Sequence, residues 1–373
     1  VAPSLSLGGN GSTPEGAVYT LTLGNVSDPG ADAVTSYIVH WGDGNSQTFV
    51  AASLPASRQV QHVYNDGNVS GTNQTIVVDL VDEDGTHTNA GSKSITVTNV
   101  APTVPLSGNA SVDEGSVYTL NVAAVVDPGV DTPTLYRINW GDGSQTDFTP
   151  AQYADLLVAG GNVTHSYADG NAAGTLRNIV VQVLDEDGTH NAGSLLVTVN
   201  NVAPSIALAG NASVDEGATY TLTLGAVTDP GTDTVASYSI DWGDGTVTAG
   251  SAGDNTHVYA DGANNYAIQV SVTDEDGTYL AGSKAVTVNN VAPTIALVGA
   301  ASVNEGASYT LNLGVVTDPG TDTVASYSID WGDGTVTAGS AGDNTHVYAD
   351  GANNYAIQVS VTDEDGTYLA GSK

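Results

Sequence analysis

The residues of this chain best suited to chemistry are carboxylates that recur in a fixed pattern. The sequence Asp-Glu-Asp-Gly-Thr occurs four times, beginning at Asp82, Asp185, Asp274 and Asp363. Alternating carboxylates begin many calcium-binding loops, in which they converge on one hard cation. No Glu follows at the twelfth position, so the pattern is not an EF-hand. The alternative interpretation is a hairpin turn with solvated carboxylates, because Asp-Gly is a strong turn signal by itself.

Trp-Gly-Asp-Gly also recurs, and a Trp side chain could serve as a stacking platform for a sugar. The motif begins at Trp41, Trp140, Trp242 and Trp331. In the third copy Trp242 alternates with polar residues and shares a face with Tyr238 and Ile240. We therefore expect this Trp to pack in a hydrophobic core, and the glycines that follow it to form a tight hairpin turn.

A His-x-Tyr motif follows each Trp motif, at His62, His165, His257 and His346. A single His without a second His, a Cys or a nucleophile at a usable spacing makes a poor catalytic site. We expect the His to hydrogen-bond a turn and the Tyr to close the end of the fold, with a metal ligand or general base as the alternative. No arrangement of Ser, His and Asp stands out, so we predict no catalytic residues and no enzymatic activity.

The charge balance favours cations as partners. The chain of 373 residues has 41 acidic and 6 basic residues, a formal net charge of -35. We expect neither nucleic acid nor an anionic membrane surface as a partner, because binding their phosphates requires a basic surface. So many carboxylates must be spread apart, solvated or neutralised by bound cations, which indicates Ca²⁺ as a cofactor. The chain has no Cys for disulfides, and no hydrophobic run is long enough for membrane insertion.

The motifs define four tandem copies of one module. Asn-Val-Ala-Pro joins successive copies, beginning at Asn99, Asn201 and Asn290. Residues 227–284 recur unchanged at 316–373, which is typical of an array that grows by gene duplication. We predict module 1 at residues 1–99, module 2 at 100–201, module 3 at 202–290 and module 4 at 291–373.

Hydrophobic alternation predicts an all-β fold. In module 3, residues 220–224 and 266–272 alternate apolar and polar side chains with a period of two. Such segments have one apolar and one polar face, as in two antiparallel sheets packed face to face. We predict an immunoglobulin-like β-sandwich of about seven strands per module, with no helix, and the modules arranged as an extended rod. Modules 1 and 2 are longer at residues 45–61 and 144–164, which we expect to be surface loops.

The combined motifs resemble the PKD domain, an immunoglobulin-like module named for polycystic kidney disease. Trp-Gly-Asp-Gly on the third strand, His-x-Tyr-x-Asp-Gly before a long alternating strand and a closing Asp-x-Asp-Gly turn carry the resemblance, which covers nearly all four modules. Members of this family occur as stalks and accessory modules in bacterial surface proteins, secreted proteases and polysaccharide-degrading enzymes, and some bind calcium. The resemblance implies a non-catalytic module of a bacterial-type surface or secreted protein, located outside the cell or on its surface.

The topology of such a sandwich places carboxylates at both ends of each module. The chain comes in at what we call the leading end and goes out at the trailing end. In module 3, Asp229, Asp233 and the turn at Asp274 fall at the leading end, and Glu216 and Asp261 at the trailing end. Because each linker is very short, the trailing carboxylates of one module meet the leading carboxylates of the next. They repel each other unless a cation bridges them.

We therefore predict calcium at the module ends or junctions, bound by trailing glutamates, leading aspartates and linker asparagines. Carboxylate and amide oxygens are the ligands that Ca²⁺ takes in proteins. The candidate ligands are Glu15, Asp28, Asp82, Asp84, Asn99, Glu114, Asp127, Asp185, Asp187, Asn201, Glu216, Asp229, Asp274, Asp276, Asn290, Glu305, Asp318, Asp363 and Asp365.

Module 4 stops at Lys373, which aligns with Lys284, so it lacks a counterpart of residues 285–290. We expect its last strand to be missing and one sheet edge to be exposed. A fragment of a longer array is the simplest interpretation, and strand donation by a partner segment is the alternative.

The function predicted from these features is a calcium-stiffened spacer or stalk of a cell-surface adhesin or large exoprotein. Its partners would be flanking repeats or domains of a longer chain. Two alternatives stay open. The modules could be polysaccharide- or protein-binding accessories of a secreted hydrolase, with surface glycans or proteins as partners. They could also form a subunit of a surface filament or S-layer-like assembly.

Overall fold

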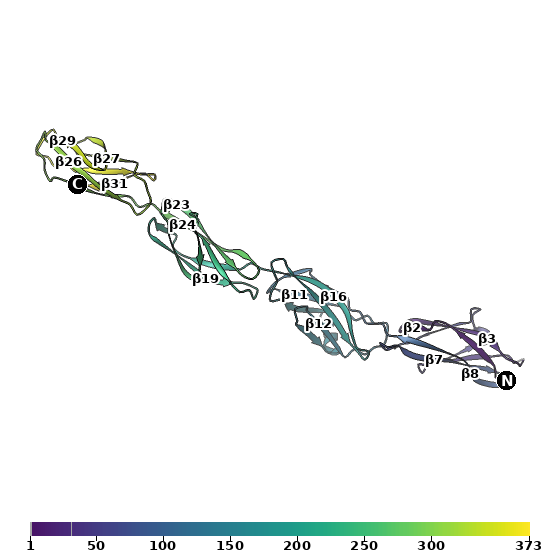
Figure 1. Ribbon diagram of the computed structural model, residues 1–373. Helices are drawn as coiled ribbons and strands as arrows, with labels where there is room; N and C mark the ends of the chain where they lie inside the picture. The colour runs from purple at the N-terminus through teal and green to yellow at the C-terminus, as the bar shows by residue number, and fades with distance from the viewer. Residues whose placement is uncertain (1, 31) are drawn as a thin grey trace. The chain divides into compact units, whose positions relative to one another are not determined.

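The structure, a computed structural model, describes residues 2–30 and 32–373. The chain forms two compact units, residues 1–200 and 201–373. Each unit contains two β-sandwich modules, and each module has its own hydrophobic core (Figure 1). The predicted all-β class of tandem sandwiches is confirmed.

Module 3 shows the common architecture, in which two sheets pack face to face. Their strand orders are β17-β19-β22 and β18-β24-β23-β20-β21. Paired strands are antiparallel, except that β18 runs parallel to the end of β24. The strands are β17 (Ser205–Ala209), β18 (Ser213–Asp215), β19 (Thr219–Thr228), β20 (Ser237–Asp241), β21 (Val247–Gly250), β22 (Gly253–Val258), β23 (Asn264–Thr273) and β24 (Thr278–Asn289). The module thus has one strand more than the predicted seven, because the three-residue β18 is too short to show alternation.

Modules 1 and 2 repeat this topology, with sheets β1-β3-β6 and β2-β8-β7-β4-β5 in the first and β14-β11-β9 and β10-β16-β15-β12-β13 in the second. The elements of module 1 are β1 (Ser4–Gly8), β2 (Ser12–Pro14), β3 (Val18–Ser27), β4 (Ser36–His40), β5 (Ser46–Val50), the 3-10 helix η1 (Ala51–Ser53), β6 (Gln59–Val63), β7 (Thr72–Asp82) and β8 (Gly85–Thr98). Those of module 2 are β9 (Leu106–Gly108), β10 (Ser111–Asp113), β11 (Val117–Val122), β12 (Leu135–Asn139), β13 (Gln145–Phe148), α1 (Pro150–Val158), β14 (Asn162–Ser166), β15 (Thr175–Leu184) and β16 (Thr189–Asn200).

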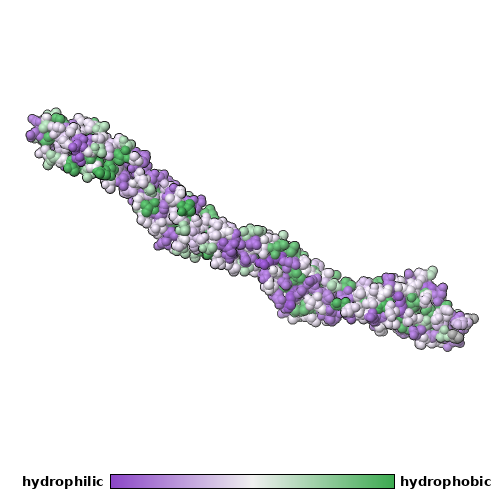
Figure 2. All heavy atoms as spheres, in the orientation of Figure 1, coloured by the Kyte–Doolittle hydropathy of each residue, from purple (hydrophilic) through white to green (hydrophobic). Residues whose placement is uncertain are grey.

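The core of each module forms from the inward faces of both sheets. In module 3, Leu222, Ile240 and Val270 are fully buried, and Trp242 is 0% exposed. The prediction that this Trp packs in the core is therefore confirmed. On the face drawn in Figure 2, hydrophobic residues lie scattered among hydrophilic and near-neutral ones, as expected when alternation sends the apolar face of each strand inward.

The helix α1 corrects the prediction that residues 144–164 form a loop without helix. Thr149 caps its N-terminus in a capping box with Gln152, and Pro150 follows the cap. Tyr153 on α1 is 3% exposed and stacks on Tyr136 of β12 with the ring centroids 4.0 Å apart. The insertion therefore adds a covering element to the core of module 2. No helix among the described residues is long and apolar enough to cross a membrane.

Module 4 has the same fold with one edge left open. Its sheets are β25-β26-β29 and β28-β27-β30-β31. In module 3, residues 285–288 pair with 264–267, and no counterpart of residues 285–288 is present here. A cavity of about 420 Å³ lies at this edge, with Val303, Tyr309, Tyr348 and Ile357 in its lining. The strands are β25 (Thr294–Gly299), β26 (Ser308–Thr317), β27 (Ser326–Asp330), β28 (Val336–Gly339), β29 (Gly342–Val347), β30 (Gln358–Thr362) and β31 (Thr367–Ser372).

Adding Ala-Val-Thr-Val-Asn-Asn after Lys373 should stabilise module 4. The added valines correspond to Val286 and Val288, which are 2% and 0% exposed in module 3. Burying each one contributes about 1.5–3 kcal/mol, from which the entropy of ordering the strand is subtracted. Differential scanning calorimetry should show the least stable transition moving to higher temperature. The control extension carries Ser in place of both valines, and equal transitions for the two extended proteins would contradict the expectation.

Candidate metal sites at the module ends

A buried glutamate organises the trailing end of each complete module. Glu216 follows β18 and is 1% exposed. Its Oε2 accepts a hydrogen bond from the backbone N–H of Gly262 at 2.7 Å, and its Oε1 accepts one from Val291 at 2.6 Å. The side chain thus ties the loop after β22 and the linker to the end of β18.

Glu15 makes the same contacts in module 1. Its oxygens accept hydrogen bonds from the backbone N–H groups of Gly67 at 2.7 Å and Val100 at 2.6 Å. Burial raises the pKa of Glu15, an effect that the two hydrogen bonds oppose and that the charges of Asp127 and Asp187 reinforce. Two modules with different sequences therefore place a carboxylate identically beside their linkers.

At the leading end, the first Asp of each Asp-Glu-Asp-Gly motif builds its own turn. In module 3, Asp274 Oδ1 accepts hydrogen bonds from the backbone N–H groups of Asp276 at 2.9 Å and Gly277 at 3.0 Å. The same two contacts form at Asp82, Asp185 and Asp363. The hairpin interpretation of the motif therefore accounts for one carboxylate oxygen of this residue, and in module 3 the other oxygen, Asp274 Oδ2, has no hydrogen-bond partner among the described residues.

The linker asparagines contact the third residue of the same motif in the following module. The Nδ2 of Asn99 donates to Asp187 Oδ2 at 2.6 Å, and that of Asn290 donates to Asp365 Oδ2 at 2.9 Å. Asn201 makes the equivalent bond to Asp276 at 2.7 Å. We predicted these side chains as metal ligands. In the structure their amide nitrogens hold a leading-end carboxylate beside the linker.

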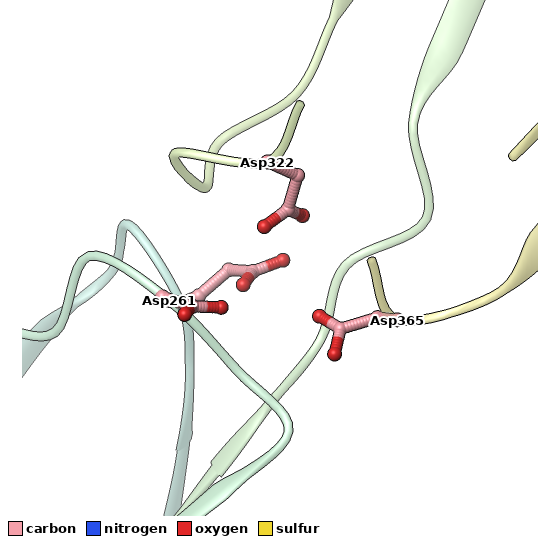
Figure 3. Close-up of side chains that lie close together, drawn as sticks. Asp261, Asp322 and Asp365 are labelled. Atoms are coloured by element: carbon pink, nitrogen blue, oxygen red, sulfur yellow. The ribbon is translucent and has the colours of Figure 1, made fainter. Parts of the chain in front are cut away.

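Carboxylates from two consecutive modules converge where module 3 meets module 4. We call Glu216, Asp261, Asp322 and Asp365 the junction cluster: each offers one carboxylate oxygen, and these oxygens lie within 4.8 Å of one another. Figure 3 shows Asp322 and Asp365 of module 4 facing Asp261 of module 3. Two like charges about 4 Å apart repel by about 4 kcal/mol at an effective dielectric constant of about 20. The cluster therefore favours a bound cation or proton.

Asp322 is surrounded by the other carboxylates of the junction cluster. Both of its carboxylate oxygens are shielded from solvent, and neither has a hydrogen-bond partner among the described residues. Burial, followed by the charges of Glu216, Asp318, Asp365 and Asp261, raises the pKa of Asp322 to about 7. An aspartate in this state lacks the donors that normally stabilise a buried carboxylate.

The junction between modules 1 and 2 repeats the arrangement. Glu15, Asp66 and Asp131 offer oxygens within 4.8 Å of one another, and the pKa of Asp131 is raised to about 7, chiefly by burial and then by Glu15 and neighbouring aspartates. Neither oxygen of Asp131 has a hydrogen-bond partner in the part of the chain that the structure describes. The counterparts of Glu216, Asp261 and Asp322 thus come together at a second junction of different sequence.

Backbone contacts hold the two modules of a unit together at these points. The N–H of Thr321 donates to the carbonyl oxygen of Ala260 at 2.9 Å, and the N–H of Val130 donates to that of Asn65, also at 2.9 Å. The approach is close enough that a Cβ added at Gly320 would lie 2.8 Å from the Glu216 carboxylate. A glycine at this position therefore lets the leading loop reach the buried glutamate.

The sequence predicted some of the carboxylates that meet at the module junctions. It selected Glu15, Glu216 and Asp365, which the structure places at the junctions, and it selected Glu305, which is exposed at the open edge of module 4. It placed Asp233 and Asp261 at the correct module ends without choosing either, or their counterparts, as ligands. The residues missed are Asp66, Asp131, Asp261 and Asp322. The recurrence of Asp-Pro-Gly-x-Asp in all four modules was the available signal.

The remaining candidates lie at the leading ends, except Glu114, which lies at the trailing end of module 2. Asp28, Asp82 and Asp32 cluster in module 1, and Asp229 and Asp274 cluster with Asp233 in module 3. Asp127 and Asp318 each accept a hydrogen bond from a backbone N–H in their own loop, and Glu114 accepts one from Gly170. Asp84 donates its backbone N–H to Asp82.

Histidines face the leading-end aspartate in two modules. His87 Nε2 lies 2.7 Å from Asp82 Oδ2 in module 1, and His190 Nε2 lies 3.2 Å from Asp185 Oδ1 in module 2. Modules 3 and 4 have Tyr279 and Tyr368 at the corresponding positions. The first two modules therefore place an imidazole beside this carboxylate, where the last two have a phenol.

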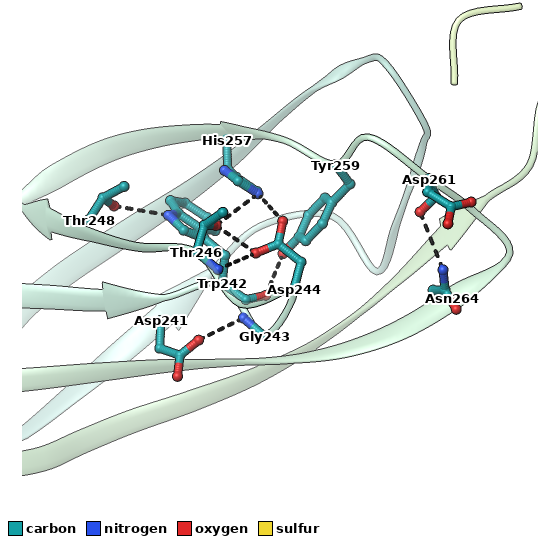
Figure 4. Close-up of polar contacts among 10 residues, drawn as sticks. All are labelled: Asp241, Trp242, Gly243, Asp244, Thr246, Thr248, His257, Tyr259, Asp261 and Asn264. Carbon is teal, nitrogen blue, oxygen red and sulfur yellow. Dashed lines mark hydrogen bonds and ion pairs between the residues drawn. The ribbon is translucent and has the colours of Figure 1, made fainter. Parts of the chain in front are cut away.

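The recurring Trp, His and Tyr form a structural network (Figure 4). His257 stacks on Trp242 with ring centroids 4.7 Å apart, and its Nε2 lies 2.7 Å from Asp244 Oδ2 in the Gly-Asp-Gly turn. Tyr259 donates its hydroxyl to the carbonyl oxygen of Trp242 at 3.1 Å. The prediction that the His hydrogen-bonds a turn is confirmed.

Two modules of this chain match a known family. Residues 201–289 and 290–372 each match the family described as PKD domain. Modules 1 and 2 share the strand order of module 3, and all four modules share the stacking of His on Trp, so the chain is similar throughout to a series of tandem PKD domains.

The chain also has matches with low TM-scores among solved structures. A tetra-tandem repeat from the extending region of a large adhesion protein has 15% identity and a TM-score of 0.40, covering 100% of this chain and 98% of that one. Fibronectin(III)-like modules of Clostridium thermocellum CbhA have 14% identity and a TM-score of 0.21, covering 50% and 94%. Domains A168–A170 of titin have 12% identity and a TM-score of 0.26, covering 73% and 96%. No curated protein matches the sequence of this PKD-like array.

Asp142→Asn should destabilise module 2 and weaken its response to acid. Burial raises the pKa of Asp142, but hydrogen bonds from Ser144 and His165 outweigh this and bring it to about 2. Because this value lies below the unfolded one, the ionised carboxylate stabilises the fold above about pH 4, and the contribution is lost as the pH falls towards about 2. We expect a loss of about 1–2 kcal/mol at pH 7 in denaturant unfolding.

The matched control is Asp155→Asn, on the exposed face of α1. It should leave both the unfolding midpoint and its dependence on pH unchanged. If the Asp142 variant behaves like this control, the network does not stabilise the module through that carboxylate.

Proposed function

We propose that this chain is a spacer or stalk segment of a cell-surface adhesin or another large exoprotein, and that calcium ions link its consecutive modules. The role is non-catalytic, and the location is extracellular or on the cell surface. Its immediate partners are neighbouring repeats or domains of a longer chain. Tandem PKD-like modules with separate cores support this function, because each repeat contacts only its neighbours in such arrays.

The observation that carries the proposal is the junction cluster. It draws two carboxylates from the trailing end of module 3 and two from the leading end of module 4, and where modules 1 and 2 meet, two trailing carboxylates face one leading carboxylate. A cation bound there contacts both modules at once. Its binding free energy therefore favours the conformation in which the modules are held together, and losing it leaves mutually repelling carboxylates.

Calcium is the cation that best fits these ligands. The cluster offers oxygen atoms only, which suit hard cations such as Ca²⁺ and Mg²⁺. Ca²⁺ accepts six to eight oxygens in flexible geometry, whereas Mg²⁺ requires a near-ideal octahedron and retains several waters. Carboxylates on four separate loops are more easily arranged around the larger ion. Extracellular modules commonly bind Ca²⁺ with dissociation constants of about 10⁻⁴–10⁻³ M.

Asp261→Asn should remove or weaken calcium binding at the junction of modules 3 and 4. Asp261 is an exposed member of the junction cluster, so its replacement should leave the fold intact. The full chain should bind Ca²⁺ in isothermal titration calorimetry and melt at a higher temperature in Ca²⁺ than in EDTA. The variant should bind fewer ions at the same free calcium concentration, because one charged ligand is lost.

Asp350→Asn is the matched control, since Asp350 lies in the same sequence context at the open trailing end of module 4. It should bind calcium like the parent protein. Mg²⁺ at equal concentration should produce a smaller shift in melting temperature. Absence of both a binding heat and a calcium-dependent melting temperature in the parent chain would refute the calcium part of the proposal.

A further inference from the structure

The leading end of module 3 contains a buried carboxylate oxygen without a donor. Asp274 is 7% exposed, and its Oδ1 accepts two backbone N–H groups of its own turn. Its Oδ2 is shielded from solvent and has no hydrogen-bond partner among the residues described. Burying a carboxylate oxygen without a donor is destabilising, so such an oxygen normally indicates a ligand or a partner.

Asp274 lies among other carboxylates of its own module. Asp229, Asp233 and Asp274, which we call the leading cluster, each offer one oxygen, and these oxygens lie within 4.8 Å of one another. Asp229 and Asp233 lie in the loop between β19 and β20, which we call the aspartate loop, and Asp274 lies in the turn between β23 and β24. The Oδ1 of Asp229 accepts the N–H of Gly231 at 3.0 Å, which fixes the start of the aspartate loop.

Two further hydrogen bonds hold the aspartate loop against the turn. The N–H of Thr234 donates to Glu275 Oε2 at 2.7 Å, and the N–H of Ala236 donates to the carbonyl oxygen of Thr273 at 2.8 Å. The Glu of the Asp-Glu-Asp-Gly motif therefore keeps the aspartate loop beside Asp274. The loop cannot move away to relieve repulsion between the carboxylates without breaking these bonds.

Module 1 has a similar group of carboxylates. Asp28, Asp32 and Asp82 offer oxygens within 4.8 Å of one another, and Asp28 Oδ2 is shielded from solvent without a hydrogen-bond partner in the described part of the chain. In this module His87 Nε2 lies 2.7 Å from Asp82 Oδ2, whereas module 3 has Tyr279 at the position of the His. Module 3 therefore offers the simpler site, built of carboxylates alone.

The ligand atoms of the leading cluster suit calcium. They are all oxygens, which hard cations prefer. Bonds from Ca²⁺ to oxygen are about 2.3–2.6 Å long, so oxygens on opposite sides of one ion lie about 4.6–5.2 Å apart. Three oxygens within 4.8 Å of one another can therefore contact the same ion, and waters can complete its six to eight ligands.

We propose that the leading cluster of module 3 binds a calcium ion of its own, separate from the ion that links modules 3 and 4. This ion joins the aspartate loop to the Asp274 turn, so it stabilises module 3 itself. It supplies the positive partner of Asp274 Oδ2 and reduces the repulsion among the three carboxylates. The inference goes beyond the proposed link between modules, because the two ions occupy opposite ends of module 3 and share no ligand.

Variants of the full chain count the two ions separately. Asp229→Asn should lose one calcium ion, Asp261→Asn should lose a different one, and the double variant should lose two. The amide introduced at position 229 retains an oxygen that can accept the N–H of Gly231. The matched control is Asp254→Asn, which removes one exposed charge from module 3 and retains an oxygen for the hydroxyl of Thr223. It should bind as many ions as the parent in equilibrium dialysis with ⁴⁵Ca at fixed free calcium.

Hydrogen exchange measured by mass spectrometry locates the ion. Modules 3 and 4 share identical residues at 227–284 and 316–373, but Ala226 corresponds to Val315 in module 4. A peptide covering residues 226–236 therefore has a mass of its own and reports on the aspartate loop of module 3. Calcium should slow exchange in this peptide in the parent and in Asp261→Asn, and should leave it unchanged in Asp229→Asn.

Thermal unfolding separates a metal ligand from a purely structural residue. In EDTA the Asp229→Asn variant should melt no lower than the parent, because one of three repelling charges is gone and the bond to Gly231 is kept. In calcium it should melt at a lower temperature, because one ion is lost. An equal loss of stability in both conditions would overturn the site.

The outcomes distinguish this inference from the proposed function. If Asp229→Asn binds as many ions as the parent while Asp261→Asn binds one fewer, the leading site is wrong and the calcium link stands. If only Asp229→Asn loses an ion, the leading site stands and the link fails. A double variant that loses no more than one ion would contradict two separate sites.

Discussion

The module ends depend on the hydrogen bonds that a buried glutamate accepts from two backbone amides. Glu216 holds the loop at Gly262 and the linker at Val291 with its two oxygens, which lie at the boundary between the modules. Removing this carboxyl group would leave both backbone N–H groups without their acceptor and release the linker. Every further aspartate at the same boundary adds repulsion between carboxylates. A positive charge placed where the modules meet would reduce this repulsion.

Most of the fold follows from local sequence patterns. Alternation in residues 220–224 and 266–272 identifies long strands, because their side chains must face either the core or solvent. The same rule fails for β18, which has three residues and owes its existence to parallel pairing with β24. It also fails for the helix α1. In the sequence this helix is marked by the capping box of Thr149 and Gln152 rather than by a long run of periodically spaced apolar residues. Short strands and helices are determined by strand pairing and helix capping, which the alternation of apolar and polar residues does not reveal.

The candidate sites were harder to predict than the strands. Topology assigns Glu216 and Asp365 to facing module ends, and the structure brings them together. Topology cannot say which aspartate of one loop faces the neighbouring module. Asp318 folds back on the N–H of Gly320, whereas Asp322, four residues later, reaches Glu216. The linker residue Asn290 was chosen as a ligand for its amide oxygen, but its amide nitrogen makes the observed bond to Asp365.

The leading-end aspartates have different neighbours in different modules. In module 1, His87 Nε2 lies 2.7 Å from Asp82 Oδ2. In module 3 the residue at that position is Tyr279, and Asp274 Oδ2 has no hydrogen-bond donor among the described residues. A phenol at this position offers no positive charge, so the surroundings of the first Asp of the turn differ between the modules that have His and those that have Tyr.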